Sequence, residues 1–262
     1  HRGDLEATEE HYKTAYALAR ETLGAEAPEA FVWWGDPKTR PYMHARQGLA
    51  QLYQETGRYE EAAPEYEALL RLNPDDNQGA RFAIGPLYQL AGDLDAALNA
   101  YDHYAENYPD DWGDPHHRFC WGLALFRDDQ PKAALRRGRE AICQNVYAAP
   151  LLLAEPLPDP DVWHGTDIGE PFYAEDYLHR YSALWNDDAL TALAVLWQAD
   201  PLQTDLDEWL DLGRRLNDLA EAARSGDADA QREWRQLVRK QQSIEDTSLS
   251  NSDLRRLLKR LP

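Results

Sequence analysis

The sequence predicts an all-α fold in which helix pairs repeat along the chain and additional helices follow them. Two observations support this prediction. A set of small, aromatic and turn-forming residues recurs at a spacing of about 35 residues, which is the length of two short helices with their connections. In addition, no segment combines the alternation of apolar and polar residues expected of a strand with turn residues at its ends.

The recurrence is clearest between residues 43 and 110. Two copies match at a spacing of 35 residues in the pairs Arg46/Arg81, Ala50/Gly85, Tyr53/Tyr88, Gly57/Gly92, Ala62/Ala97, Tyr66/Tyr101 and Pro74/Pro109. A third copy follows at a spacing of 37 residues through Arg118, Gly122, Leu125, Asp129 and Ala134. This copy then degenerates, because Gly138 stands where the other two carry a tyrosine.

Each recurring residue type has a physical reason. Small residues such as Gly85 let the two helices of a pair cross closely, and Gly57 permits the left-handed backbone that ends a helix. Tyr66 is expected to fill the space between successive pairs. Pro74 stops the second helix, because its ring removes a backbone donor and restricts the residue before it.

This pattern resembles the tetratricopeptide repeat, whose unit is a helix–turn–helix of about 34 residues. The resemblance implies an α-solenoid, a right-handed superhelix of helix pairs, followed here by additional C-terminal helices. Its concave surface would be lined by the first helix of each pair. Proteins of this kind bind other proteins or peptides, so a protein or peptide partner is expected.

Three longer segments carry a more specific resemblance: Thr39–Arg46 leading into Gly48–Ala50, Leu72–Arg81, and Glu175–Trp185. They resemble a group of uncharacterised bacterial tetratricopeptide proteins, which is distantly similar to the suppressor-of-tumorigenicity-seven family. The resemblance covers roughly residues 33–200 and implies a repeat scaffold without a known activity.

The chain is predicted to divide into four regions. These are an N-terminal half-repeat with a Trp-containing connection (1–42), the repeats (43–149), a Pro-rich loop (150–171) and a C-terminal helical region (172–262). In the half-repeat, Tyr12, Ala15 and Leu18 are placed like residues of a second repeat helix. The C-terminal region is predicted to contain helices near 172–186, 188–199, 205–224 and 227–246. A last short helix is predicted from about 251, with Ser250 or Ser252 as its N-cap.

The formal net charge of −20 disfavours binding to nucleic acid or to anionic membranes. Residues 1–212 hold 16 Lys/Arg and 39 Asp/Glu, whereas residues 213–262 hold 11 and 8. The tail ends in a short basic amphipathic helix that we expect to dock on the acidic body. No apolar run is long enough to span a membrane, and we expect a cytoplasmic protein.

Nothing in the sequence predicts a catalytic residue, a metal site or a cofactor. Cys120 and Cys143 belong to no Cys-x-x-Cys pair, and His116 with Cys120 supplies two ligands where zinc needs three or four. Gly-rich phosphate loops and nucleophile elbows are also missing. We therefore expect a protein that is not an enzyme. The alternative is an enzyme whose site is assembled from distant residues.

The resemblance to the tetratricopeptide repeat implies which positions of the first helices face the concave surface, and these positions define the candidate peptide-binding groove. It combines a row of amides with aromatic side chains and one cation: Gln47, Gln51, Gln54, Phe82, Gln89, Phe119, Phe126 and Arg127. Amides can hydrogen-bond an extended peptide backbone, and the aromatic rings can receive apolar anchors.

Three alternatives stay open. The C-terminal helices could fold back and bury the aromatic residues of the groove. They could instead pack into the groove of a neighbouring copy, which makes a self-associating homo-oligomer the second functional hypothesis. Arg46, Arg81 and Arg118 could bind a polyanion, but we expect them to pair with acids of neighbouring helices.

Overall fold

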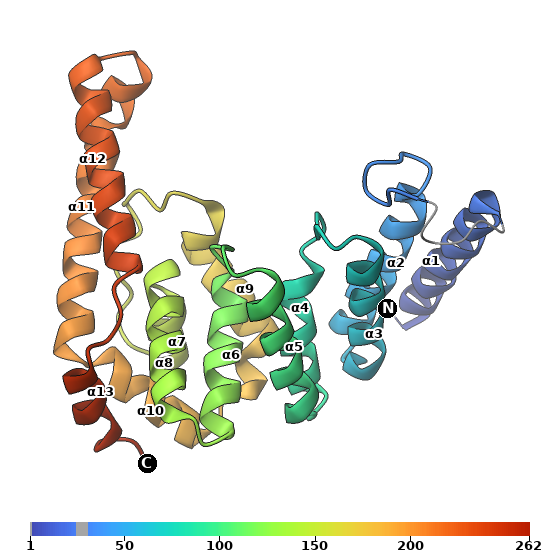
Figure 1. The fold of residues 1–262 in the computed structure, drawn as a ribbon, viewed down its shortest axis with the longest axis horizontal. Coiled ribbons are helices and arrows are strands. Elements are labelled where there is room, and N and C mark those ends of the chain that lie inside the picture. Colours follow the sequence, from blue (N-terminus) through green and yellow to red (C-terminus); the bar gives the residue numbers. More distant parts are fainter. Residues whose placement is uncertain (1, 25–30) are drawn as a thin grey trace. The chain divides into compact units, whose positions relative to one another are not determined.

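The computed structural model describes residues 2–24 and 31–262, and these residues form helices and loops without a strand (Figure 1). The all-α prediction with neighbouring helix pairs is therefore confirmed. The chain divides into two compact units, His1–Asp111 and Trp112–Pro262, and the division falls inside the range predicted as repeats. None of the described helices is long and apolar enough to cross a membrane.

The first unit contains the helices α1 (Arg2–Leu23), α2 (Arg40–Glu55), α3 (Tyr59–Leu72), α4 (Ala80–Leu90) and α5 (Leu94–Asn107). Each helix packs against the next one along the chain. Fully buried residues such as Met43, Ala50 and Leu87 form the core. The recurring tyrosines Tyr53, Tyr66 and Tyr101 are buried as well, and Tyr88 packs against the core partly buried.

The half-repeat predicted before residue 42 corresponds to α1, which packs on α2. The Tyr12 ring lies so close to Gly48 that a Cβ atom there would stand 2.2 Å from it. Gly48 is therefore the residue that lets α1 approach. Leu18, which was predicted to pack like a repeat residue, is 58% exposed instead.

The predicted helix ends are confirmed by the backbone. Gly57 and Gly92 have φ angles of 75° and 84°, and the amide after each donates to the carbonyl five residues earlier, as in a Schellman motif. In the third pair Asp129 takes this place with a φ of 54°, and Gln130 makes the matching hydrogen bond to Leu125. The third turn thus keeps its geometry without glycine.

The second unit starts with the pair α6 (Pro115–Arg127) and α7 (Pro131–Gln144). It continues through α8 (Ala148–Leu153), η2 (Asp167–Gly169), α9 (Pro171–Tyr181), η3 (Ser182–Leu184), α10 (Asp187–Trp197), α11 (Asp200–Arg224), α12 (Ala228–Glu245) and α13 (Asn251–Leu258). The predicted C-terminal helices are all present, with Ser250 as the N-cap of α13, whereas α8 was not predicted.

Helix α7 is the centre of the second unit, because α6, α10, α12 and α13 all pack on it. Helices α11 and α12 form a long hairpin, drawn in orange to red in Figure 1. The basic tail helix α13 packs on α7 within its own unit. Because α7 itself carries Lys132, Arg136 and Arg137, attraction to acidic residues, on which the expected docking rested, does not explain this contact.

One buried cation connects α7 to this hairpin. The Arg139 side chain is 1% exposed, and its Nη2 lies 2.6 Å from Asp205 Oδ2 on α11. The same nitrogen donates to Ile244 O at 2.9 Å, and Nη1 donates to Thr247 O. Because the last carbonyl groups of a helix lack partners within the helix, Arg139 acts as the cap of α12.

We predict that Arg139→Met destabilises the second unit by about 3 kcal/mol, because the change removes one partner of a buried pair and leaves carbonyl groups unpaired. Chemical denaturation followed by circular dichroism measures the free energy of unfolding. Arg136→Met, on the exposed side of α7, is the matched control and should change it by less than about 0.5 kcal/mol. Equal effects of the two changes would contradict the role of Arg139.

Candidate partner-binding surface

Two glutamines of the predicted groove are buried inside the first unit. Gln54 is 8% exposed and accepts a hydrogen bond from the Tyr66 hydroxyl at 3.5 Å, and Gln89 is 4% exposed and donates to the Tyr101 hydroxyl at 2.6 Å. The two pairs occupy equivalent positions, 35 residues apart. Each links the first helix of a pair to its second helix, so these amides are structural groups.

Gly85 lets the ring of Tyr101 approach helix α4 closely. A Cβ atom at Gly85 would lie 2.5 Å from the Tyr101 ring, which itself is fully buried. The ring therefore packs directly on the backbone of α4. A tyrosine hydroxyl inside such a contact needs a polar partner, and Gln89 supplies it.

The other groove residues of the first unit are more accessible. Gln51 is exposed, whereas Gln47 is half-buried and exchanges hydrogen bonds with Gln78, whose Nε2 lies 2.7 Å from Gln47 Oε1. Phe82 is half-buried, with the Arg81 guanidinium 4.1 Å from its ring centroid. The face predicted on α2 and α4 thus offers one open amide, one partly engaged amide and one aromatic ring.

In the second unit, α9 and the residues after it cover much of the third predicted segment. Phe119 is 1% exposed, and its ring centroid lies 5.2 Å from that of Tyr177 on α9. Arg127 is exposed but donates from Nη2 to Leu184 O. This arrangement corresponds to the alternative in which C-terminal helices fold back over the aromatic residues.

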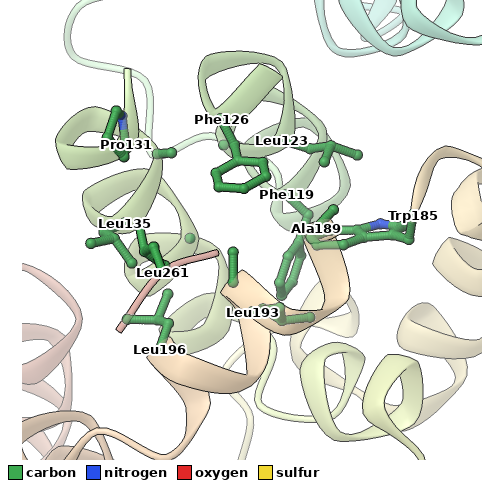
Figure 2. Close-up of a pocket in the computed structure, with 14 residues that line it drawn as sticks. Phe119, Leu123, Phe126, Pro131, Leu135, Trp185, Ala189, Leu193, Leu196 and Leu261 are labelled. Carbon is green, nitrogen blue, oxygen red and sulfur yellow. The ribbon is translucent and has the colours of Figure 1, made fainter. Parts of the chain in front are cut away.

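In the third pair, Phe126 stands where the first two pairs carry the buried glutamine, and Gly138 stands where they carry the tyrosine. A methyl group at Gly138 would stand 2.9 Å from Leu196 Cδ2, so α10 occupies the space that a tyrosine ring fills elsewhere. The exchange leaves an apolar cavity of about 40 Å³. Figure 2 shows Phe126 from α6, Leu193 and Leu196 from α10 and Leu261 from the tail around it.

The three arginines at the repeated position are engaged with acids, which confirms the structural interpretation. Their partners lie on neighbouring helices or in the adjoining loops and are reached over distances of 2.5 to 3.6 Å. The pairs are Arg46 with Glu65, Arg81 with Asp76 and Asp111, and Arg118 with Glu140. A polyanion would have to displace these carboxylates.

A surface that the sequence did not predict lies between α3, α4 and α5. It is a hollow of about 660 Å³, which we call the α3–α5 hollow. Its lining consists of Glu67, Leu70, Arg71, Pro74, Arg81, Ile84, Tyr88, Ala96, Asn99, Ala100, His103, Tyr104, Asn107 and Tyr108. The volume is typical of binding pockets.

Two alanines create this hollow. Ala96 and Ala100 on α5 stand 35 residues after Glu61 and Glu65 on α3, which form ion pairs with Arg58 and Arg46. The long, ion-paired glutamate side chains therefore fill the space beside α3. The short alanine side chains leave the equivalent space beside α5 open. These two small residues were the only sequence signal of the hollow.

Three tyrosines give the α3–α5 hollow an ordered aromatic wall. The Tyr88 hydroxyl donates to Glu67 Oε1 at 2.7 Å, and burial together with this carboxylate raises the pKa of Tyr88 to about 12. Tyr108 donates to Pro74 O at 2.7 Å, and its ring stacks on Tyr104 with centroids 5.8 Å apart. Fixed tyrosines of this kind are frequent anchors in protein interfaces.

The two cysteines are unreactive in the folded chain. Burial raises the pKa of Cys143 to about 12 and raises that of Cys120 further, so both thiols stay protonated. Buried, protonated thiols are poor nucleophiles. Among residues 2–24 and 31–262, no group of three His, Cys, Asp or Glu side chains is arranged to hold a metal ion.

One buried histidine fixes the Pro-rich loop. His164 Nε2 lies 2.7 Å from the Tyr147 hydroxyl, and Nδ1 lies 3.2 Å from Glu170 Oε1. Burial lowers the pKa of His164, although Glu170 opposes this shift. Burial likewise lowers the pKa of His116, whose ring stacks on Tyr173 with centroids 4.0 Å apart. Both histidines join segments of the second unit.

The model of the tetratricopeptide repeat family matches residues 44–76, which include α3 and most of α2. Repeats of this type are typically non-catalytic modules for protein interaction. No curated protein and no solved structure matches the chain. The comparisons thus support one tetratricopeptide repeat and give no support to the resemblance to the suppressor-of-tumorigenicity-seven family.

We predict that Tyr101→Phe destabilises the first unit by about 1–3 kcal/mol, because it deprives the buried Gln89 amide of its hydroxyl partner. Thermal or urea unfolding measures the loss. Gln51→Leu is the control on the exposed side of the equivalent helix and should change the stability by less than about 0.5 kcal/mol. A neutral Tyr101→Phe substitution would show that Gln89 does not depend on this bond.

We predict that the stability of the second unit falls as the pH drops below about 6.5, the ordinary pKa of histidine. Since burial lowers the pKa of His116 and His164 in the folded chain, the unfolded chain binds more protons in this range. The loss at pH 5.5 should be at most about 1.4 kcal/mol for each histidine.

Urea unfolding at pH 7.5 and pH 5.5 checks this dependence. His164→Gln should reduce the difference in the free energy of unfolding between the two pH values, because one titrating group is gone. An exposed histidine provides the control, and His179→Gln should leave the difference as in the wild type. A wild-type chain that is more stable at pH 5.5 would refute the prediction.

Proposed function

We propose that the chain is a non-enzymatic protein-interaction module and that its first unit holds a segment of a partner protein in the α3–α5 hollow. The observation that carries the proposal is the combination of a matched tetratricopeptide repeat with an open, tyrosine-walled hollow in the same unit. A repeat array without a nearby reactive group is suited to binding.

The chemistry of the α3–α5 hollow favours a segment with apolar side chains. Its lining includes Leu70, Ile84 and the two small alanines of α5, together with the amide group of Asn99. Apolar side chains of a partner would be buried on these apolar residues, while the Asn99 amide could bind its backbone.

The charge of the first unit favours a basic partner. Residues 1–111 hold 9 Lys/Arg and 21 Asp/Glu, a formal charge of −12. Positive residues flanking the apolar part of the partner segment would therefore be attracted and would speed association. Arg81 does not oppose this, because Asp76 and Asp111 neutralise it.

The face predicted from the repeat positions remains the second candidate surface for the same function. Gln47, Gln51 and Phe82 are the residues of that face in the first unit that a partner could reach. The hollow is preferred because it combines a concave shape with apolar area, whereas Gln47 is already engaged with Gln78.

Paired substitutions test the two surfaces. We predict that Ala100→Arg, which fills the α3–α5 hollow, lowers the amount of captured partner at least about tenfold, since it removes the apolar contact area. Gln51→Arg adds the same side chain to the other face and should leave capture unchanged. Quantitative affinity capture from a lysate of the source cells, with the three chains in parallel, is the measurement.

If Gln51→Arg reduces capture and Ala100→Arg does not, the binding surface lies on the face of α2 and α4 instead. The proposed function would be contradicted if neither substitution reduces the amount of captured partner, or if the wild-type chain captures no partner. Thermal unfolding of each variant confirms that the fold is intact. Light scattering of the wild type also tests the self-association alternative, since a mass that stays at one chain at every concentration excludes a homo-oligomer.

A further inference from the structure

A second hollow lies outside the repeats, on the α11–α12 hairpin. Its volume is about 620 Å³, and we call it the hairpin hollow. Of the residues that the structure describes, it is lined by two tryptophans, two arginines, two amides and two alanines: Trp163, Trp234, Arg224, Arg235, Asn217, Gln231, Ala220 and Ala223. None of these lining residues is acidic. Tryptophan and arginine are among the residue types most enriched where a few side chains dominate the binding between proteins.

Contact with the backbone of α11 fixes Trp163 at the hairpin hollow. Its backbone nitrogen donates to Gly213 O at 3.1 Å, and a Cβ atom at Gly213 would stand 3.0 Å from Val162 Cβ. The missing side chain of Gly213 therefore lets the Pro-rich loop lie directly on α11. Asn217 adds to this attachment by donating to Asp161 Oδ1 at 3.4 Å.

The two indoles of the hairpin hollow form an angular aromatic surface. The ring centroids of Trp163 and Trp234 are 5.3 Å apart, and the ring planes meet at 76°. Both side chains are half-buried, so part of each ring stays accessible. A third aromatic ring could stack on one indole and approach the other with its edge, which are the two arrangements that aromatic pairs prefer.

Bonds between α11 and α12 help to fix the width of the hairpin hollow. Arg215 pairs with Glu233 at 3.3 Å, and Gln231 Nε2 donates to Ala223 O at 3.0 Å. Between these bonds α11 presents Ala220, whose short side chain leaves the space open. The hollow is therefore already formed in the folded hairpin.

Among the residues that the structure describes, neither arginine of the hairpin hollow forms an ion pair. Three other arginines of the same hairpin do: Arg214 with Asp211, Arg215 with Glu233 and Arg232 with Asp229. Arg224 and Arg235 instead donate from Nε to carbonyl oxygens of their own helices, Ala220 O and Gln231 O. Their terminal nitrogens are therefore available for the carboxylates of a ligand, which accept charge-assisted hydrogen bonds.

The charge of the whole hairpin decides between the classes of negatively charged ligand. Residues 200–245 hold 7 Lys/Arg and 11 Asp/Glu, so the hairpin as a whole is acidic. A nucleic acid or an anionic membrane extends beyond the hollow and would be repelled there. A short acidic segment keeps its carboxylates close to the two arginines, within the range of about 10 Å over which exposed charges interact.

We propose that the hairpin hollow is a second binding surface and that it takes an acidic segment of a partner protein. An aromatic side chain of the segment packs against Trp163 and Trp234, and the carboxylates beside it pair with Arg224 and Arg235. This surface thus selects the opposite charge to the one that the acidic first unit attracts.

The test is a titration of the full chain, labelled with nitrogen-15, with the tripeptide acetyl-Asp-Phe-Asp-amide. The readout is the set of NMR signals of the tryptophan indole groups, in which Trp163→Phe and Trp234→Phe identify the two signals concerned. We expect these two signals to shift with a dissociation constant of about 1 mM or lower, while the other indole signals keep their positions. If either of the two stays in place up to about 10 mM tripeptide, the proposal is overturned.

Substitutions of arginine test the carboxylate contacts. Arg224→Gln combined with Arg235→Gln should weaken the binding of the tripeptide at least about fivefold, because both cationic partners are lost. Arg214→Gln combined with Arg232→Gln removes the same charge from the same hairpin and should change the affinity by less than about twofold, since neither residue lines the hollow. Equal effects of the two pairs overturn the proposal. Binding of acetyl-Lys-Phe-Lys-amide as tight as that of the acidic tripeptide also overturns it.

A single-stranded DNA of about ten thymidines is the competing probe, because bases also stack on aromatic side chains. If it shifts the two indole signals at a lower concentration than the tripeptide does, the hollow binds nucleic acid and the proposal is overturned. Ala100→Arg in the first unit should leave the tripeptide titration unchanged. The outcome at the hairpin hollow is therefore separate from the outcome of the capture experiment on the α3–α5 hollow.

Discussion

The packing of a tyrosine ring directly on the backbone of the neighbouring helix is the contact on which the repeat depends. At Gly85 the ring of Tyr101 leaves no room for a Cβ atom. The contact brings a phenolic hydroxyl into the core, and the buried Gln89 amide satisfies it. This one contact therefore requires a small residue, an aromatic residue and an amide at fixed intervals in the sequence. The same three residue types recur in the first pair as Ala50, Tyr66 and Gln54.

The third pair shows the consequence of losing this contact. Gly122 and Gly138 bring the backbones of α6 and α7 together without a ring between them, with the Gly138 amide nitrogen 3.3 Å from a Cβ atom placed at Gly122. The space beside them must be filled by other parts of the chain. Helix α10 and the tail do so from outside the pair, and the second unit is built around α7 as a result.

Much of the fold could be predicted from the sequence, because the governing residues are local. Gly57 and Gly92 end helices through their own backbone conformation, and Ser250 caps α13 through its own hydroxyl. The ion pairs of Arg46, Arg81 and Arg118 were also predicted correctly, because a chain with a net charge of −20 contains many more acidic than basic residues. Periodicity and composition carry this information without any knowledge of distant contacts.

The candidate site was much less predictable, because exposure depends on the segments that pack on a residue from elsewhere. Position alone assigned Gln54 and Gln89 to a groove, but a hydroxyl twelve residues later holds each of them inside. Phe119 occupies a groove position as well, but Tyr177, 58 residues further along, covers it. The α3–α5 hollow depends on two alanines whose importance emerges only beside the longer side chains at the equivalent positions of the first pair.

The distribution of the thiols gives the molecule an internal reporter. Cys120 and Cys143 both lie in the second unit, and the first unit contains no cysteine. Because the folded chain keeps both sulfurs protonated and away from solvent, an alkylating reagent can react only after the helices around them separate. The rate of alkylation therefore follows the opening of the second unit alone, and the first unit can unfold or bind without contributing to the signal.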